Sequence, residues 1–247
     1  MTVPRFLTTP QGRSIAYDRI GGRGPGVVFL HGLRSDMTGT KALALADWAR
    51  RTGRAFLRFD CSGHGRSSER FEDGAVGDWF EDALAALDRL TDGPQVLVGS
   101  SMGGGLALLL ARAVPGRIKG LVGIAAAPDF TEDSMWAQAT EAQRTALLRD
   151  GFIELPGDDA DAPYVVTRRL IEEGRAHLVL RRPLSLPFPV RLLHGTADRD
   201  VPPAVALHLL DHARGPDMRL TLVKDADHRF SAPACLALIE AAIAEVS

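Results

Sequence analysis

A serine in a tight, glycine-rich segment is the first residue whose surroundings could support chemistry. Residues 99–103 read Gly-Ser-Ser-Met-Gly, a G-x-S-x-G motif with Ser101 at its centre. Apolar runs at 96–98 and 106–111 predict a strand before the motif and a helix after it. A strand, a sharp turn and a helix in that order push the serine hydroxyl out above the sheet. Ser101 is therefore the candidate nucleophile for attack on a carbonyl carbon.

A serine nucleophile requires a base that takes its proton and an acid that orients the base. His228 is the candidate base, and it follows an apolar run that reads as a strand. Asp198 follows another such run and is the candidate acid. Asp198 ranks above Asp200 because it comes earlier in the same loop. Two further carboxylates could hold a neighbouring role: Asp225 and Asp227.

The oxyanion that forms during attack on a carbonyl needs two backbone N–H donors. We expect the first from Met102, directly after the nucleophile. We expect the second from the loop after the early strand, which reads His31-Gly32-Leu33-Arg34, and we assign it to Leu33. Gly32 permits this loop to turn inward, and the Leu33 side chain could also line an acyl pocket.

The remaining histidines give weaker signals for a metal or a cofactor. His208 and His212 lie four residues apart and resemble half a metal site, but the glutamate of H-E-x-x-H and a third ligand are missing. His64 lies in a segment that nearly matches the dinucleotide motif G-x-G-x-x-G, except that its last position is serine. His177 and His194 read as structural. We therefore expect neither a metal nor an organic cofactor.

Composition and charge argue against several classes of protein. The chain has 247 residues with 29 Lys+Arg against 31 Asp+Glu, which gives a formal net charge of −2. No long run of like charge suggests a nucleic-acid partner. Cys61 and Cys235 are too few and too far apart for a disulfide framework or a zinc knuckle. Neither a signal peptide nor a run of about 18 apolar residues is found, so we expect a cytoplasmic protein without stable membrane insertion.

Short apolar runs alternate with longer helical patterns, as in βαβ units around a mostly parallel sheet. The predicted buried strands cover residues 27–30, 55–59, 96–98, 121–124, 190–193 and 220–223. An antiparallel hairpin at the sheet edge is expected from residues 5–8 and 14–20. The helices predicted to cover the sheet span residues 40–51, 78–90 and 231–246.

Residues 130–188 interrupt this alternation. They offer helical patterns over about 132–149 and about 164–173, and no strand candidate of the sheet type. Ligands of open α/β sheets bind outside the carboxyl ends of the strands, so an insertion there predicts a lid. We divide the chain into an α/β core, residues 1–129 with 189–247, and a helical lid, residues 130–188. Five apolar residues could line an acyl channel or pack the lid on the body: Met135, Trp136, Phe152, Tyr164 and Phe188.

With these residues the chain resembles an α/β-hydrolase from about residue 5 to about residue 245. The chain order Ser, Asp, His is the order of that fold. Several stretches resemble, more narrowly, the mitochondrial palmitoyl-protein thioesterases that also cleave acyl glucuronides: residues 35–45, 58–63, 92–101 and 191–195, with Asp227-His228-Arg229. The resemblance implies that Ser101, Asp198 and His228 are nucleophile, acid and base. A transit peptide is absent, which suggests a bacterial relative, and His31-Gly32 follows the general hydrolase pattern rather than this branch.

These inferences predict a serine esterase or thioesterase that transfers an acyl group to water through an acyl-enzyme. The expected substrate is a small-molecule ester, an acyl thioester or an acylated protein. A carbon–carbon bond hydrolase or a cofactor-free haloperoxidase would use the same triad, and a non-catalytic module that binds a small ligand would keep the fold. Arg34, Arg66 and Arg229 flank the expected mouth and could meet an anionic leaving group. The sequence does not determine an oligomeric state.

Overall fold

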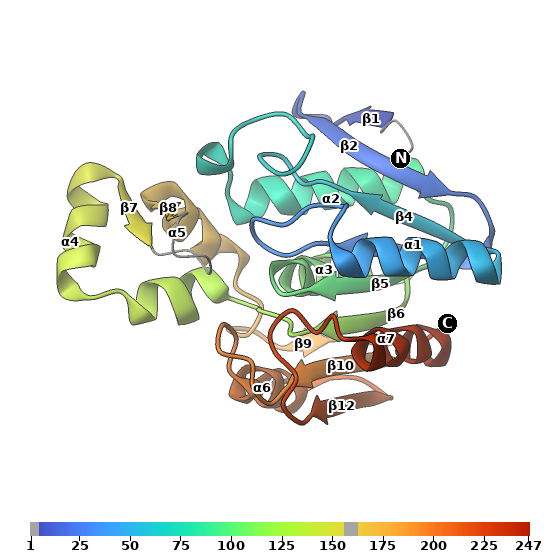
Figure 1. The fold of residues 1–247 in the computed structure, drawn as a ribbon. Helices are drawn as coiled ribbons and strands as arrows, with labels where there is room; N and C mark the ends of the chain where they lie inside the picture. Colours follow the sequence, from blue (N-terminus) through green and yellow to red (C-terminus); the bar gives the residue numbers. More distant parts are fainter. Residues whose placement is uncertain (1–4, 156–162) are drawn as a thin grey trace.

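The computed structural model describes residues 5–155 and 163–247. Within this part of the chain, eight strands form one sheet in the order β1-β2-β4-β3-β5-β6-β10-β12 (Figure 1). Its strands are β1 Arg5–Thr8, β2 Ser14–Ile20, β3 Arg23–Leu30, β4 Arg54–Phe59, β5 Gln95–Ser100, β6 Ile118–Ile124, β10 Val190–Gly195 and β12 Met218–Val223. β1 pairs antiparallel with β2, and β2 antiparallel with β4, whereas the remaining neighbours are parallel. The predicted fold class and the edge hairpin are confirmed.

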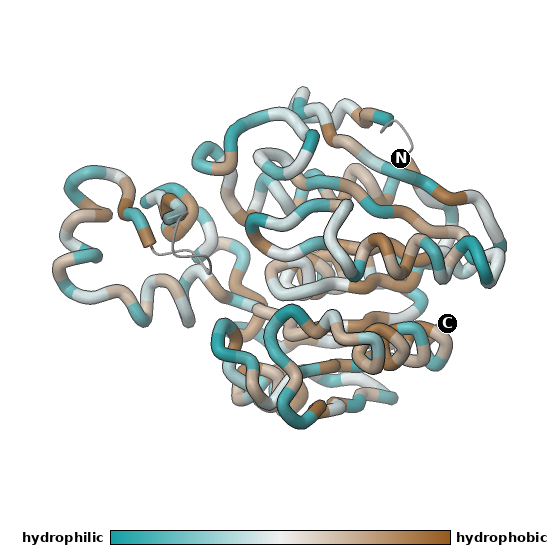
Figure 2. Tube along the Cα trace, viewed as in Figure 1, coloured by the Kyte–Doolittle hydropathy of each residue, from teal (hydrophilic) through white to brown (hydrophobic). Residues whose placement is uncertain are grey.

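The central strands form because their side chains are buried on both faces of the sheet. Every residue of β5 and of β10 is buried, which explains why these strands read as continuous apolar runs rather than as alternating ones. Apolar residues concentrate along the central strands and the helices against them (Figure 2). β12 lies at an edge of the sheet and has no buried residue, so the prediction of a strand at 220–223 is confirmed but its predicted burial is wrong.

Helices cover both faces of the sheet, and β3 shows how one strand supplies both cores. Val27 and Phe29 pack with α1 Thr40–Thr52 and α7 Pro233–Glu245, whereas Val28 and Leu30 pack with α2 Val76–Leu90 and α3 Met102–Ala113 (Figure 1). This separation follows from the two-residue period of a strand. α6 Pro203–His212 adds Leu209 to the core that contains α2 and α3.

The helix ends agree with the predicted ones to within about two residues. α1 ends where predicted, because Gly53 has φ +68° and donates its N–H to the carbonyl of Ala49. α2 begins two residues before the predicted Asp78, whose carboxylate accepts the N–H of Ala75. Three short 3₁₀ turns complete the core and its junction with the insertion: Phe71–Asp73, Pro115–Arg117 and Arg175–His177. No helix in the described residues is long and apolar enough to cross a membrane.

The insertion differs from the two helices predicted there. A π-helix spans Thr131–Trp136, and α4 Glu141–Asp150 begins separately, because Thr140 and Gln143 form a capping box that starts a new helix. The predicted absence of strands is wrong, since β7 Phe152–Leu155 pairs antiparallel with β8 Tyr164–Thr167.

The predicted helix over 164–173 is wrong in its first four residues. Those residues, Tyr-Val-Val-Thr, are β-branched or aromatic and extend as β8. Thr167 then caps α5 Arg168–Gly174 by accepting the N–H of Leu170 at 3.1 Å. Beyond α5, β9 Leu184–Ser185 pairs with β11 Ala213–Arg214, which ties the returning chain to the core. The insertion projects from one side of the sheet (Figure 1), and its role as a lid stays a prediction.

Candidate active site

Ser101 occupies a strained turn between β5 and α3. Its φ of +54° lies in the left-handed region, which non-glycine residues rarely adopt. The end of β3 packs closely against this turn, and glycine at position 103 makes that possible. A Cβ added to Gly103 would lie 2.2 Å from the carbonyl oxygen of Leu30. The N–H of Ser101 is held by the carbonyl of Ile124 at 2.9 Å. These contacts hold the strained backbone of Ser101 in place, so that its hydroxyl lies at the end of β5.

The structure brings the predicted nucleophile, base and acid together. Ser101 Oγ lies 3.1 Å from His228 Nε2, and His228 Nδ1 lies 2.8 Å from Asp198 Oδ2. Ser101 and His228 are 127 residues apart in sequence. The Asp198 carboxylate is fully buried, whereas the His228 side chain is 22% exposed, so solvent reaches the predicted base but not the predicted acid.

Two neighbouring loops hold the acid and the base. Asp198 follows β10 and His228 follows β12, which are parallel neighbours in the sheet. The loops are joined by a hydrogen bond from the N–H of Ala197 to the carbonyl of Ala226 at 3.0 Å. They approach so closely that a Cβ at Gly195 would lie 2.1 Å from the oxygen of Ala226. The two loops can therefore lie this close only with glycine at position 195.

Four donors surround the Asp198 carboxylate. Oδ1 accepts the backbone N–H groups of Asp200 and Val201 at 3.0 and 2.9 Å, while Oδ2 faces His228 Nδ1 and also His194 Nε2 at 3.3 Å. Burial by itself would raise the pKa of Asp198, but the hydrogen bonds from His194, His228 and Val201 outweigh burial and hold that pKa well below its ordinary value. The acid therefore stays ionised at neutral pH. Asp200, the alternative acid, contributes its backbone N–H to this arrangement.

The loop expected to supply the second oxyanion donor adjoins the nucleophile. A Cβ added to Gly32 would lie 3.4 Å from Ser101 Cβ. His31 Nε2 accepts the N–H of Cys61 at 3.0 Å, so the ring proton sits on Nδ1 and is donated to the carbonyl of Gly32 at 2.8 Å. In a trans peptide the carbonyl and the next N–H point in opposite directions, so the N–H of Leu33 points away from His31.

Met102, which we expect to supply the other oxyanion donor, is the first residue of α3 and is buried. N–H groups in the first turn of a helix lack partners within the helix and carry its positive dipole end. This end of α3 is suited to a developing negative charge. The assignment of Leu33 and Met102 as the donors remains a prediction.

An apolar cavity lies between α3 and the insertion. Met102, Leu106 and Leu109 line it from α3, and Ala127 lines it from the loop after β6. Phe130, Thr131, Gly174, His177 and Val179 close it from the insertion. Because Met102 follows the nucleophile directly, the cavity begins beside the site. Among the described lining residues are none of the five apolar insertion residues that the sequence suggested.

Those five residues have other surroundings. Trp136 lies between the guanidinium groups of Arg144 and Arg175, at 5.1 and 5.0 Å from its ring centre. Phe152 is 49% exposed, whereas Phe188 is buried in the core. Met135 packs against the same core from a partly buried position.

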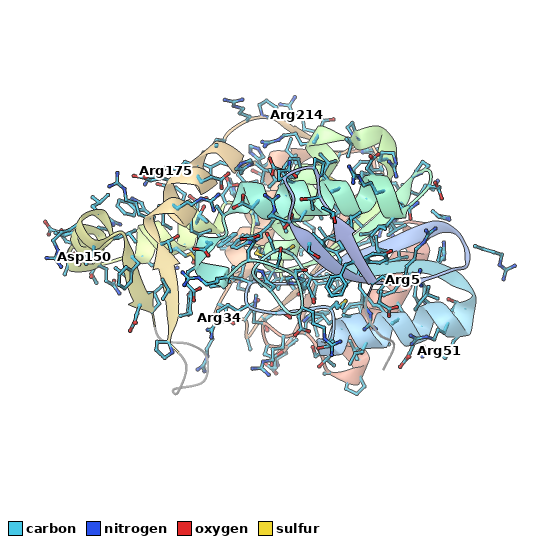
Figure 3. The ribbon with its side chains drawn as sticks, turned by 90° about the horizontal axis from the view of Figure 1, so that it is seen from above. Arg5, Arg34, Arg51, Asp150, Arg175 and Arg214 are labelled. Atoms are coloured by element: carbon cyan, nitrogen blue, oxygen red, sulfur yellow. The ribbon has the colours of Figure 1, made fainter. Side chains whose placement is uncertain are left out.

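Arg34 and Tyr164 connect the oxyanion loop to the insertion. The Arg34 guanidinium lies over the Tyr164 ring, 4.9 Å from its centre. Figure 3 labels Arg34 where the core meets the insertion. Of the other two arginines expected near the mouth, Arg229 is exposed beside His228, and Arg66 donates its backbone N–H to Asp60 at 2.9 Å.

The described residues place metal-ligating side chains together beside the predicted acid and base. Their one cluster of metal-ligating side chains is Asp198, Asp200 and His228. The His212 ring contacts the carbonyl of Arg182 at 2.8 Å, and no third ligand joins it and His208.

Two residues near the triad were not identified as functional from the sequence. His194 contacts Asp198, and its spacing four residues before the acid is the only sequence signal for that contact. Lys41, on the first turn of α1, donates from Nζ to the carbonyl of Arg229, next to the base. No local motif marks Lys41, because its partner lies 188 residues away.

The ammonium group of Lys41 should make the stability of the fold depend on pH. Burial lowers the pKa of Lys41 from 10.5 to about 8, although Asp227 acts in the opposite direction. Between these two pH values the unfolded chain therefore binds more protons than the folded protein. Burial of the charged ammonium lowers the unfolding free energy by its full amount below pH 8, and this penalty is relieved as the pH rises. Between about pH 7.5 and 9.5, the wild type should gain on the order of 1 kcal/mol in unfolding free energy relative to Lys41→Met.

Urea unfolding of the wild type and Lys41→Met at both pH values measures this difference. Lys224→Met, which removes an exposed lysine, is the control and should show no such change. A difference between wild type and Lys41→Met that stays constant with pH would contradict the lowered pKa.

Comparison with known proteins agrees with this architecture. The Alpha/beta hydrolase family matches residues 27–241. The chain is 37% identical over 239 residues to "Palmitoyl-protein thioesterase ABHD10, mitochondrial" of Rattus norvegicus, covering 96% of this chain and 80% of the relative. The Homo sapiens protein of the same name is 35% identical over 235 residues, covering 95% and 76%.

Two solved structures are similar over nearly their whole length. A putative hydrolase from Agrobacterium vitis S4 has 40% identity and a TM-score of 0.94, covering 99% of this chain and 98% of that one. Mouse alpha/beta hydrolase domain-containing protein 10 has 34% identity and a TM-score of 0.92, with the same coverage. The eight-stranded sheet, the serine turn after β5 and these matches together establish that the chain belongs to the α/β-hydrolase family.

Proposed function

We propose that this α/β-hydrolase cleaves carboxylic ester or acyl-thioester bonds through a covalent acyl-enzyme. The observation that carries the proposal is the hydrogen-bonded series Ser101 Oγ, His228 Nε2, His228 Nδ1 and Asp198 Oδ2, with spacings of 3.1 and 2.8 Å. The names of the relatives support a thioester as substrate, since they are palmitoyl-protein thioesterases. The mostly apolar lining of the cavity beside Met102 supports an acyl chain as the recognised group, and the cavity's volume of about 20 Å³ means that a long chain must enlarge it.

The proposed reaction begins when Ser101 Oγ attacks the carbonyl carbon and His228 Nε2 takes the hydroxyl proton. Asp198 keeps the imidazole in the tautomer whose free nitrogen faces the serine, and it stabilises the imidazolium that forms. The N–H groups of Leu33 and Met102 hold the oxyanion. Collapse breaks the bond to the thiol or alcohol, which leaves with the proton from His228. Water then attacks the acyl-enzyme, with His228 as base, and releases the carboxylic acid and free Ser101.

A substrate series and a covalent probe test the proposal together. The kcat/KM values for acyl thioesters, simple esters and an acyl glucuronide, each with matched acyl chains, identify the leaving group that the enzyme prefers. A fluorophosphonate should form an adduct on Ser101, which mass spectrometry of the peptide locates. A protein with no adduct and no turnover would instead be a binding module that retains the fold.

The cavity beside α3 predicts a dependence on acyl-chain length. Leu109 is buried and lines this cavity, so Leu109→Trp should fill it. Loss of even one methylene contact in an apolar pocket costs about 1–3 kcal/mol of transition-state binding, so kcat/KM for a palmitoyl thioester should fall roughly 10- to 200-fold. The value for an acetyl thioester should change less than about threefold, because a two-carbon acyl group does not extend into the cavity.

Each preparation of Leu109→Trp carries its own control, since the acetyl substrate reports the fraction of folded enzyme. Leu43→Trp, at an exposed leucine on α1, should leave both substrates unaffected. Equal losses on short and long chains would show that the acyl chain lies elsewhere.

A further inference from the structure

A second histidine contacts the acid of the triad. His194 lies in β10, and its side chain is buried. Its Nε2 is 2.8 Å from the carbonyl oxygen of Val201 and 3.3 Å from Asp198 Oδ2. Its Nδ1 is buried and has no hydrogen-bond partner among the described residues. The mechanism above assigns this histidine no step.

These contacts define how the His194 ring carries its proton. A carbonyl oxygen can only accept, so the hydrogen bond to Val201 places the proton on Nε2, which lies 3.3 Å from Asp198 Oδ2. A second proton on Nδ1 would be a buried donor without a partner, which is costly. The ring therefore carries its proton on the nitrogen that lies beside the carboxylate of Asp198.

His194 Nε2 and His228 Nδ1 both lie near the same oxygen of Asp198. The distances to Oδ2 are 3.3 Å from His194 and 2.8 Å from His228. The donor from His194 draws negative charge from this oxygen and so weakens its attraction for an imidazolium at His228. Rotation of the carboxylate would break the bonds that Asp200 and Val201 donate to Oδ1. It would also break the contact of His194 with Oδ2, so His194 adds to the resistance against rotation.

A single residue, Val201, forms hydrogen bonds with both Asp198 and His194. Val201 donates its N–H to Asp198 Oδ1 at 2.9 Å, and its carbonyl accepts from His194 at 2.8 Å. The segment that carries Asp198 runs from His194, in β10, to Val201, and the hydrogen bond between these two residues holds both of its ends. The other ionisable groups at this point are His228, from the loop after β12, and Asp200, whose carboxylate lies within 4.8 Å of the two triad members.

We propose that His194 is a positioning residue of the triad, which fixes the rotamer of Asp198 and moderates the basicity that Asp198 confers on His228. The inference rests on the proposed function, because it assigns a role within the same site. His194 itself touches neither the substrate nor Ser101 in the proposed reaction. Its effect is therefore expected in kcat and in the pH profile rather than in KM.

Two substitutions separate the donor from the bulk of the ring. His194→Phe keeps an apolar ring of similar size and removes the donor, whereas His194→Gln places an amide N–H at about the distance of Nε2. His212 provides matched controls, because its Nε2 also contacts a carbonyl at 2.8 Å, but on the exposed surface away from the triad. His212→Phe and His212→Gln should behave like the wild type.

For His194→Phe we expect kcat to fall about 10- to 100-fold, as is typical when a residue that orients an active-site group is lost. KM should change less than about threefold. The acidic limb of the kcat/KM profile should move to higher pH, since an Asp198 with one donor fewer holds the imidazolium more strongly. His194→Gln should recover most of kcat and return the limb toward that of the wild type.

Fluorophosphonate titration of active sites normalises every rate, so that partial unfolding of a variant does not imitate a loss in kcat. Normalised rates and an acidic limb equal to those of the wild type would overturn the proposal. So would a uniform loss in both His194 variants with an unmoved limb, which is the result expected of a merely structural residue.

Nitrogen-15 NMR of the histidine-labelled wild type gives a reading that does not depend on catalysis. We expect one ring, assigned to His194 by its loss in His194→Gln, to carry its proton on Nε2 rather than on Nδ1. The Nδ1–H signal of His228 should shift in the same variant. A His194 ring protonated on Nδ1 would overturn the inference even if the enzyme proved to cleave no ester, whereas absent labelling and turnover in the wild type would overturn the proposed function alone.

Discussion

Ser101→Ala should lower kcat for an acyl thioester or a p-nitrophenyl ester by about 10⁴- to 10⁶-fold, to the residual rate that substrate binding and the oxyanion donors still support. The Ser101 hydroxyl lies 3.1 Å from His228 Nε2, so its loss removes the group that the predicted base activates. Alanine at a φ of +54° is strained about as much as serine, so the turn and the fold should be retained. Steady-state kinetics and loss of the fluorophosphonate adduct measure the effect.

Ser100→Ala is the matched control for this substitution. Ser100 precedes the nucleophile, is buried at the end of β5 and does not contact His228. Its replacement should keep the adduct and most of the activity. Near-normal turnover by purified Ser101→Ala, or an adduct on Ser100 in its place, would refute the assignment of the nucleophile.

Asp198→Asn should lower kcat up to about 10⁴-fold with little change in the fold, by analogy with the same change in serine proteases. Asparagine can still accept the N–H groups of Asp200 and Val201 on its oxygen. Its amide then faces His228 and donates, so the imidazole turns to the tautomer with its proton on Nε2. That tautomer cannot take the proton of Ser101.

Kinetics as a function of pH distinguish this defect from simple unfolding. The pKa of Asp198 is held well below its ordinary value, so the wild type keeps an ionised acid at neutral and mildly acidic pH. The Asn variant should gain activity as the pH rises, because hydroxide increasingly replaces the missing base. Asp200→Asn is the control and should lose no more than about tenfold, since the observed contact of Asp200 with the acid is through its backbone N–H. A larger loss in Asp200→Asn than in Asp198→Asn would make Asp200 the acid.

Much of the fold was predictable because its signals are local. A buried parallel strand needs a short apolar run, and β5 and β10 show one with every residue buried. The α1 helix ends at a glycine in the left-handed conformation, which the residue type announces. The serine turn is similarly local, because the glycines that it needs lie within a few residues of Ser101.

The insertion was predicted less well, because its local signals are weak and compete. The segment at about 132–149 reads as one helix, but the capping box at Thr140 divides it. The run at 164–167 fits a helix or a strand, and pairing with β7 selects the strand. The choice depended on a partner segment that periodicity does not reveal.

Residue types and their chain order determined the nucleophile, base and acid as candidates, since few residues can activate a serine and each follows a strand. Tertiary structure alone decided that these groups lie 3.1 and 2.8 Å apart, that an apolar cavity opens beside Met102, and that His194 shares an oxygen of the acid with His228. The physical reason is distance along the chain. Parallel strands bring the ends of remote segments to one edge, and only the packed sheet fixes which donors face which oxygen.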